Sequence, residues 1–300
     1  QYAMQIIMSF LMITAMSIML PRANVAALRI DEVLKTEVSI QDPETPVHSS
    51  EEVKGEIEFD HVSFAYPEAG ENVLTDISFK AKKGQTIAVI GSTGSGKSTL
   101  INLIPRYYDV TKGSVKVDGV DVRDMTQKEL RDKLGYVPQK GVLFSGTIDS
   151  NIRYGKPEIT DAQVKEAAEV AQATEFIDTK PEKYKSPVSQ GGTNVSGGQK
   201  QRLSIARAIA KDPEIFIFDD SFSALDFKTD SQLRKALKEY TKDATTVIVA
   251  QRISTILGAD QIIVLDDGHM EGIGTHKELM ANCEVYQQIA RSQLSEEELA

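Results

Sequence analysis

The chain has 300 residues, of which 41% are hydrophobic, and a formal net charge of -10. This length suits one large domain with appendages, and the acidic balance argues against a nucleic-acid partner. The single cysteine excludes an internal disulfide and is typical of a reducing compartment.

The N-terminal segment differs from the rest of the chain. Residues 1–21 carry no charge and are mostly apolar. A segment of this length and composition is long enough to cross a bilayer as a helix. A signal peptide would begin with basic residues, which are missing here. Met4, Met8, Met12 and Met16 share one helical face, which indicates packing against neighbouring helices or, alternatively, an adaptable binding cavity. We expect residues 1–21 to be the end of a transmembrane helix, in a chain that begins inside a longer protein.

A charged segment follows the expected span. Arg22, Arg29 and Lys35 favour the cytoplasmic side for what comes next. A mixed helical pattern continues past the span and gives way to a linker that contains proline, serine and acidic residues. We therefore expect a helix extension and linker over residues 22–54 and a soluble domain over residues 55–300.

The soluble domain begins with short alternating strands, expected near residues 57–59 and 72–79. A hairpin is expected over residues 115–122, around Asp118-Gly119. Helices are expected to begin at Thr126 and Thr160, each with a capping-box partner three residues later, Glu129 and Gln163.

The run GSTGSGKST follows the apolar strand Thr86–Ile90 and precedes a helix. Its glycines let backbone N–H groups turn toward phosphate oxygens, Lys97 reaches the outer phosphates, and the Ser98 hydroxyl can ligate magnesium. A glycine-rich turn without a ligand is the alternative. The motif predicts a bound nucleoside triphosphate but not a particular function. The residues expected to contact the nucleotide here are Gly91, Ser92, Thr93, Gly94, Ser95, Gly96, Lys97, Ser98 and Thr99.

Later parts of the domain complete an α/β pattern. Residues 141–205 are largely helical in pattern and indicate an inserted helical subdomain. Three apolar runs after it, at residues 215–218, 246–249 and 261–265, are typical of strands buried in a parallel sheet.

Two further features stand at, and about twenty residues before, the end of the first of these runs. Asp219 ends an apolar strand, as a magnesium-holding carboxylate should, although it could simply cap the next turn. Ser196 and Gln199 are spaced as a capping box, which places a helix N-terminus there, where backbone N–H groups can receive a phosphate.

Together these motifs closely resemble the ABC ATPase family from Leu20 to the C-terminus. The resemblance implies that Ser196, Gly197, Gly198 and Gln199 form the signature motif, which binds the γ-phosphate of a nucleotide held by the partner domain. It also implies that Tyr66 stacks on adenine; a simple strand-end aromatic is the alternative.

In that family Gln139 would contact magnesium and report to the membrane domain, so the implied metal ligands are Ser98, Gln139 and Asp219. Asp226 resembles the acid at the dimer interface, with a turn-capping role as the alternative. The expected fold is a P-loop NTPase core with an antiparallel β subdomain and an inserted helical subdomain, preceded by a transmembrane helix.

The family further implies an exporter of the multidrug kind in the inner or plasma membrane, with the ATPase domain on the cytoplasmic side. Its cofactors would be ATP and Mg²⁺. Its partners would be the membrane, a transported small molecule and a second, non-identical exporter subunit, with no nucleic acid.

Three departures from the family pattern concern hydrolysis. Asp220 stands where the water-orienting base is normally Glu, Gln251 replaces the switch histidine, and Gln190 replaces a Glu ahead of the signature. A carboxylate shortened by one methylene and an amide that cannot become cationic both weaken catalysis while leaving binding intact. We therefore expect Asp220 and Gln251 to form a degenerate site, in a subunit whose signature completes a competent site on the partner.

Two other functions fit parts of this pattern. An ATP-dependent clamp without transport turnover would use the same motifs. A soluble ABC ATPase of DNA maintenance would need long coiled coils between the phosphate loop and the signature, and the intervening segment is too short for them.

Overall fold

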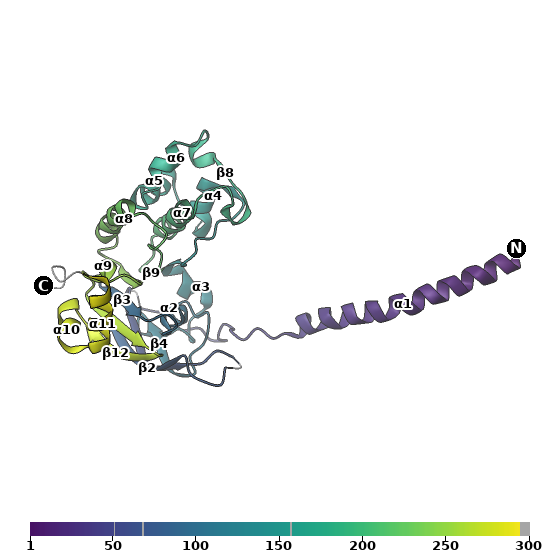
Figure 1. Ribbon diagram of the computed structural model, residues 1–300, viewed down its shortest axis with the longest axis horizontal. Helices are drawn as coiled ribbons and strands as arrows, with labels where there is room; N and C mark the ends of the chain where they lie inside the picture. Colours follow the sequence, from purple (N-terminus) through teal and green to yellow (C-terminus); the bar gives the residue numbers. More distant parts are fainter. Residues whose placement is uncertain (51, 68, 157, 295–300) are drawn as a thin grey trace. The chain divides into compact units, whose positions relative to one another are not determined.

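The computed structural model describes residues 1–50, 52–67, 69–156 and 158–294 (Figure 1). Positions 51, 68, 157 and 295–300 of the expected linker and ATPase domain lie outside the described residues. The chain divides into two compact units, Gln1–Gln41 and Asp42–Ala300. The second unit begins at Asp42, inside the segment that the sequence assigns to a linker.

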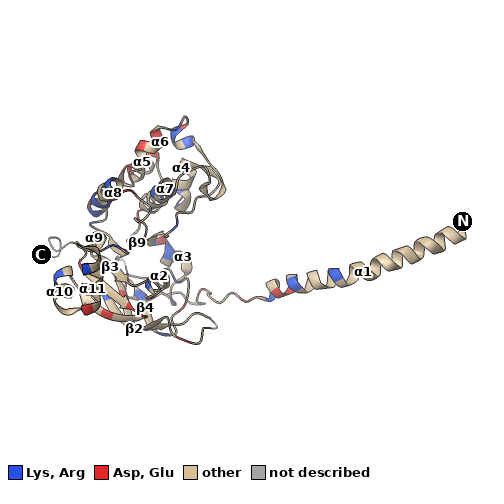
Figure 2. Ribbon diagram, in the orientation of Figure 1, with Lys and Arg blue, Asp and Glu red and all other residues tan. Residues whose placement is uncertain are grey.

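The first unit consists mainly of one helix, α1 (Tyr2–Lys35), which continues through Pro21. It is long and apolar enough to cross a membrane by length and composition. The hydroxyls of Ser9, Thr14 and Ser17 donate to carbonyls four residues earlier, so these polar groups are satisfied within the helix. Figure 2 shows that the charged residues of α1 lie toward its C-terminal end.

A mostly parallel sheet forms the centre of the second unit. Within the described residues its strand order is β12-β11-β3-β10-β9-β6, with β12 alone antiparallel to its neighbour. The three apolar runs predicted as buried parallel strands are β9, β10 and β11, so this part of the α/β prediction is confirmed. The strands are β3 (Thr86–Gly91), β6 (Leu134–Val137), β9 (Ile215–Asp219), β10 (Thr245–Val249), β11 (Gln261–Asp266) and β12 (His269–Gly274).

The register of this sheet places the ends of its strands side by side. Val249 of β10 pairs with both Asp219 of β9 and Val89 of β3, and Gly91 of β3 pairs with Leu265 of β11. Parallel strands have their carboxyl ends at the same edge, so the loops that leave this edge are neighbours. The residues following β3, β9, β10 and β11 can therefore form one site.

The second sheet is the expected antiparallel subdomain, with strand order β2-β1-β4-β5. The first strand is longer than its alternating pattern predicts, because it pairs with β2 on one side and β4 on the other across irregular registers. Asp118 and Gly119 have φ of 52° and 78°, as a two-residue hairpin turn requires. The strands are β1 (Ile57–Phe64), β2 (Leu74–Ala81), β4 (Lys112–Val117) and β5 (Val120–Asp121).

The inserted helical subdomain is also present. It packs α4, α5 and α6 with the apolar face of α7 into one buried cluster (Figure 1). The complete capping boxes expected at Thr160 and Ser196 both form. Its elements are β7 (Gly146–Thr147), α4 (Ile148–Ile152), η1 (Arg153–Gly155), α5 (Asp161–Val170), α6 (Thr174–Asp178), η2 (Lys183–Lys185), β8 (Pro187–Val188), η3 (Gln190–Gly192) and α7 (Gly197–Ala210).

The remaining helices lie before and after that subdomain in the chain. At the start of α3 only half of the expected capping box forms: the Thr126 side chain accepts from the Glu129 N–H, but the Glu129 carboxylate lies 2.7 Å from His48 Nδ1. These helices are α2 (Lys97–Leu103), α3 (Gln127–Asp132), α8 (Phe227–Tyr240), α9 (Ile253–Ile256), α10 (His276–Asn282) and α11 (Glu284–Gln293).

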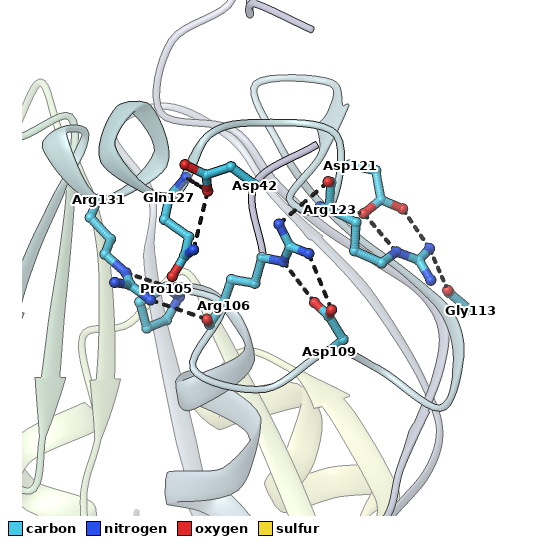
Figure 3. A network of polar contacts seen from close by, with 9 residues as sticks. All are labelled: Asp42, Pro105, Arg106, Asp109, Gly113, Asp121, Arg123, Gln127 and Arg131. Atoms are coloured by element: carbon cyan, nitrogen blue, oxygen red, sulfur yellow. Dashed lines mark hydrogen bonds and ion pairs between the residues drawn. The ribbon is translucent and has the colours of Figure 1, made fainter. Parts of the chain in front are cut away.

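The segment ahead of β1 is docked on the rest of the second unit (Figure 3). Asp42 Oδ1 accepts hydrogen bonds from the Gln127 backbone N–H at 2.9 Å and from Gln127 Nε2 at 3.1 Å. These bonds, helped by the nearby Arg106 and Arg131, lower the pKa of Asp42. The Val47 N–H also donates to the Asp124 carbonyl, at 2.8 Å. Residues 42–48 therefore lie along the start of α3.

Replacing Asp42 by Ala should release this docked segment. The Gln127 amide loses its acceptor, so its hydrogen exchange should accelerate and residues 42–50 should become more accessible to protease. The depressed pKa means that the contact is present above the unfolded pKa of Asp42 and is lost as pH falls through its folded value. The exposed neighbour Glu44→Ala is the matched control; equal exchange rates in the two variants would show that Asp42 does not hold the segment.

Candidate functional site

The phosphate loop runs from the end of β3 to the start of α2 and depends on its glycines. A Cβ at Gly91 would lie 2.0 Å from the Leu265 carbonyl oxygen. Gly96 has φ of 94°, and a Cβ there would lie 2.7 Å from the Leu74 side chain. The loop can thus follow this path only with glycine at both positions. This path brings the backbone N–H groups of the loop together at the N-terminus of α2.

Lys97 is held by its own loop. Its Nζ donates to the Gly91 carbonyl at 2.9 Å and to the Ser92 carbonyl. Burial lowers the pKa of Lys97, and the carboxylates of Asp219 and Asp220 oppose that shift. The ammonium therefore lies between the loop and two acids, where phosphate oxygens can replace the carbonyl acceptors.

Ser98 and Asp219 form a pair of oxygen donors beside this loop. The Ser98 hydroxyl donates to Asp219 Oδ1 at 3.0 Å. Burial raises the pKa of Asp219, and the neighbouring Asp220 raises it further. A hydroxyl and a carboxylate fit magnesium, which prefers oxygen ligands and keeps several waters. A bound cation would also offset the cost of ionising the buried acid, so these residues suit the metal implied by the resemblance.

Three predicted residues meet at the next position. Asp220 Oδ2 accepts from Gln251 Nε2 at 2.7 Å and from Gln139 Nε2 at 3.1 Å. Gln139 follows β6, Asp220 follows β9 and Gln251 follows β10, so the aligned strand ends bring them together. Asp220 is buried and has φ of 44°, a left-handed conformation that Asp adopts more readily than most residues. Two amides thus fix one carboxylate oxygen.

Tyr66 lies just past β1 and beside α2. Its hydroxyl is 2.9 Å from Thr99 Oγ1, and its ring packs edge-on against Phe64 and Tyr108. The aromatic is therefore placed next to the helix that begins at the phosphate loop. This position is compatible with either role considered for it, base stacking or strand-end packing.

The predicted signature and Asp226 lie together at the starts of two helices. Ser196 caps α7 by accepting from the Gln199 N–H, and Asp226 caps α8 by accepting from the Thr229 N–H at 3.0 Å. This capping lowers the pKa of Asp226. A Cβ on Gly198 would lie 3.4 Å from the Ala224 carbonyl oxygen, so the two motifs are adjacent. Ser196, Gly197 and Asp226 are exposed, and these motifs face solvent.

One residue near the loop was not predicted. The Ser92 hydroxyl donates to Asp266 Oδ1 at 3.0 Å, which ties the phosphate loop to the end of β11. The available signal was that Asp266 directly follows an apolar strand, as Asp219 does. Its distance of 174 positions from Ser92 hid the contact from local pattern analysis.

Comparisons with known proteins agree on one family. The family model for ABC transporters matches residues 74–223. An uncharacterized ABC transporter ATP-binding protein of Mycobacterium tuberculosis is 47% identical over 295 residues, which is 97% of this chain and 50% of the relative. A Staphylococcus aureus protein named "Putative multidrug export ATP-binding/permease protein" is 47% identical over 236 residues, which is 79% of this chain and 41% of that protein.

A solved structure gives the same result. A bacterial Atm1-family ABC exporter with ATP bound superposes with a TM-score of 0.85 at 34% identity, over 92% of this chain and 48% of that one. The predicted α/β ABC ATPase fold is therefore confirmed. The chain spans about half the length of the curated relatives it matches.

Replacing Asp219 by Asn should separate stability from metal binding. The Asn oxygen can still accept from Ser98, while a buried charge is removed, so at neutral pH the variant should be about 1 kcal/mol more stable. Because burial raises the folded pKa of Asp219, ionisation costs folding free energy at neutral pH, and the gain of the variant should shrink as pH falls through the folded pKa and vanish below the unfolded pKa. Thermal melts between pH 3 and 8 measure this.

The same variant should lose the Mg²⁺-dependent part of its nucleotide affinity in titrations with and without the metal. The exposed Asp243→Asn is the matched control and should change neither quantity. An unchanged magnesium dependence in the Asp219 variant would remove that residue from the metal site.

Proposed function

Because the chain belongs to the ABC transporter family, we propose that it is the ATP-binding part of one subunit of a heterodimeric exporter. In this proposal the complex couples ATP binding and hydrolysis to export of a small molecule. The exporter name of the Staphylococcus relative and the exporter structure with bound ATP support the direction of transport. The observation that carries the proposal is the pair of amides that hold the short carboxylate of Asp220.

The nucleotide would be held at the end of the central sheet. Residues Gly91–Thr99 would surround the phosphates and Tyr66 would lie against the adenine. Ser98, Asp219 and Gln139 would hold Mg²⁺, which neutralises phosphate charge when bound. Lys97 would exchange its loop carbonyl acceptors for phosphate oxygens. These residues bind and orient the substrate.

Hydrolysis at this site would be weak because its carboxylate is poorly placed to activate water. The Asp220 carboxylate is one methylene shorter than Glu, and both amides donate to the same oxygen of it. Gln251 contributes an N–H donor in this arrangement and cannot take up a proton as an imidazole can. A shortfall of about 1 Å in the position of a base costs on the order of 100-fold in rate.

The signature would act on the partner subunit. Ser196, Gly197 and Asp226 are exposed, and the N-terminus of the 14-residue helix α7 is available to an anion from outside the chain. The non-identical partner would supply the catalytic groups that this chain lacks. These departures resemble the degenerate-site subunit of the Thermotoga maritima heterodimeric exporter, and that arrangement is part of the proposal.

The membrane assignment rests on α1. Residues 1–21 would end a transmembrane helix of the inner or plasma membrane, and residues 22–54 would lead to the ATPase domain on the cytoplasmic side. The apolar helix and the basic residues after it support this orientation.

A clamp or regulatory module without transport turnover is the second candidate. A site that binds ATP and holds its carboxylate in place suits a stable dimer in which the nucleotide is bound between two ATPase domains. The two functions differ in whether the partnered complex turns over ATP while it moves a solute.

Combining Asp220→Glu with Gln251→His should restore the missing groups. In the assembled complex with the partner subunit, ATPase activity should rise roughly twofold as a second site becomes competent, with ATP affinity unchanged. Steady-state phosphate release and nucleotide titration measure the two quantities. The unaltered chain paired only with itself should hydrolyse ATP very slowly.

Asp212→Glu is the matched control, because Asp212 is also left-handed, with φ of 51°, and lies at the far end of α7. It should leave activity unchanged. A flat ATPase rate in the combined variant, or brisk hydrolysis by the self-paired chain, would contradict the degenerate-site proposal.

A further inference from the structure

A cavity of about 370 Å³ lies on the side of the central sheet opposite α2. Side chains alternate along each strand: Ile217, Val247 and Val89 share a core with α2, and their neighbours point to the other face. On that face, α8 forms one wall of the cavity and the segment around α9 forms the other. The space therefore lies between the sheet and two helices of the same compact unit.

The floor of the cavity is mainly apolar. Ala88 of β3, Ile248 of β10 and Phe218 of β9 line it, with Phe222 beyond the end of β9. A surface of this kind suits the apolar body of a ligand. The volume is near the lower end of small-molecule sites, which fits a single ring or short chain and excludes a nucleotide or a lipid.

One polar atom in this floor has no partner. Thr246 is 5% exposed and lines the cavity, and its Oγ1 makes no hydrogen bond within the part of the chain that the structure describes. An unsatisfied buried hydroxyl is costly, and Val would fit the same strand position without that cost. The oxygen is also shielded from solvent, so this polar atom interrupts the apolar floor without facing the open space.

The rim of the cavity is basic. Arg234, Lys235 and Lys238 of α8 line it, and Figure 2 shows the basic residues along this helix. Arg234 is partly neutralised by Asp230 at 3.0 Å, whereas the two lysines add charge. A Cβ on Gly258 would lie 4.0 Å from Lys238 Nζ, so this ammonium reaches across to the opposite wall. An anion at the rim would meet at least two cationic groups.

We propose that this cavity binds a small amphipathic organic anion. Its apolar body lies on Ala88, Ile248 and Phe218, and its acidic group meets Lys235 and Lys238. Thr86 and Thr246 stand at the amino-terminal ends of their strands, away from the edge where the phosphate loop begins. The cavity lining contains none of the residues assigned to the nucleotide site, so the test is independent of the proposed transport function.

Fluorine NMR of 3-fluoro-4-hydroxybenzoate tests the proposal with the full chain in lipid nanodiscs, referenced to empty nanodiscs. We expect saturable broadening of the probe signal. Lys235→Gln combined with Lys238→Gln should weaken binding about tenfold or more. Thr246→Val removes a buried hydroxyl that has no partner and should raise Tm by about 2–4 °C.

Lys228→Gln is the matched control, because Lys228 lies on α8 outside the cavity lining and its loss should leave binding unchanged. Equal binding of the neutral analogue 3-fluoro-4-hydroxybenzyl alcohol would show partitioning into an apolar space and would overturn the proposal. So would equal weakening by Lys228→Gln and by the double lysine variant, or no saturable binding at millimolar probe.

Discussion

The candidate site depends on one constraint, the register of the buried parallel strands. β3, β9, β10 and β11 are held side by side by backbone hydrogen bonds, and a shift of two residues in any strand would move its last side chain by about 7 Å. The apolar side chains on both faces prevent such a shift, because it would expose them or leave cavities. Stability and function therefore depend on the same packing: the core fixes the positions at which Lys97, Asp219 and Gln251 emerge.

At the end of this sheet, the chemistry of Asp220 depends on the number of hydrogen-bond donors that approach its two carboxylate oxygens. Each amide that approaches the carboxylate can donate, and both use one oxygen, so the other oxygen is the remaining acceptor for a ligand or water. A histidine in place of Gln251 could alternate between donor and acceptor. The amide arrangement holds the carboxylate without providing a proton carrier, and this is the basis of the proposed weak hydrolysis.

Features encoded over a few neighbouring residues were predictable from the sequence. The phosphate loop, the buried strands and the capping boxes at Thr160 and Ser196 depend on local spacing, and the structure has them. Contacts between distant segments were not predictable: Glu129 turns from its helix cap to His48, which lies 81 positions earlier, and Asp266 reaches Ser92. Their partners are chosen by the folded arrangement, for which local sequence carries no signal. The same reason hid the cavity beside Thr246, since a threonine within a β-branched run looks like an ordinary strand residue.

The docked segment connects the residues ahead of β1 to the same carboxylate. Asp42 is bonded to the first residue of α3, α3 leads through Lys133 into β6, and Gln139 follows that strand and bonds Asp220. A displacement of residues 42–48 would therefore act on α3, which leads into β6, the strand that ends two residues before Gln139. These contacts form a continuous route from Asp42 to Asp220. Energetic coupling along this route requires, in addition, a second stable position of α3. The short length of α3 and its half-formed cap make it the part of the route that is easiest to move, because few internal hydrogen bonds hold it.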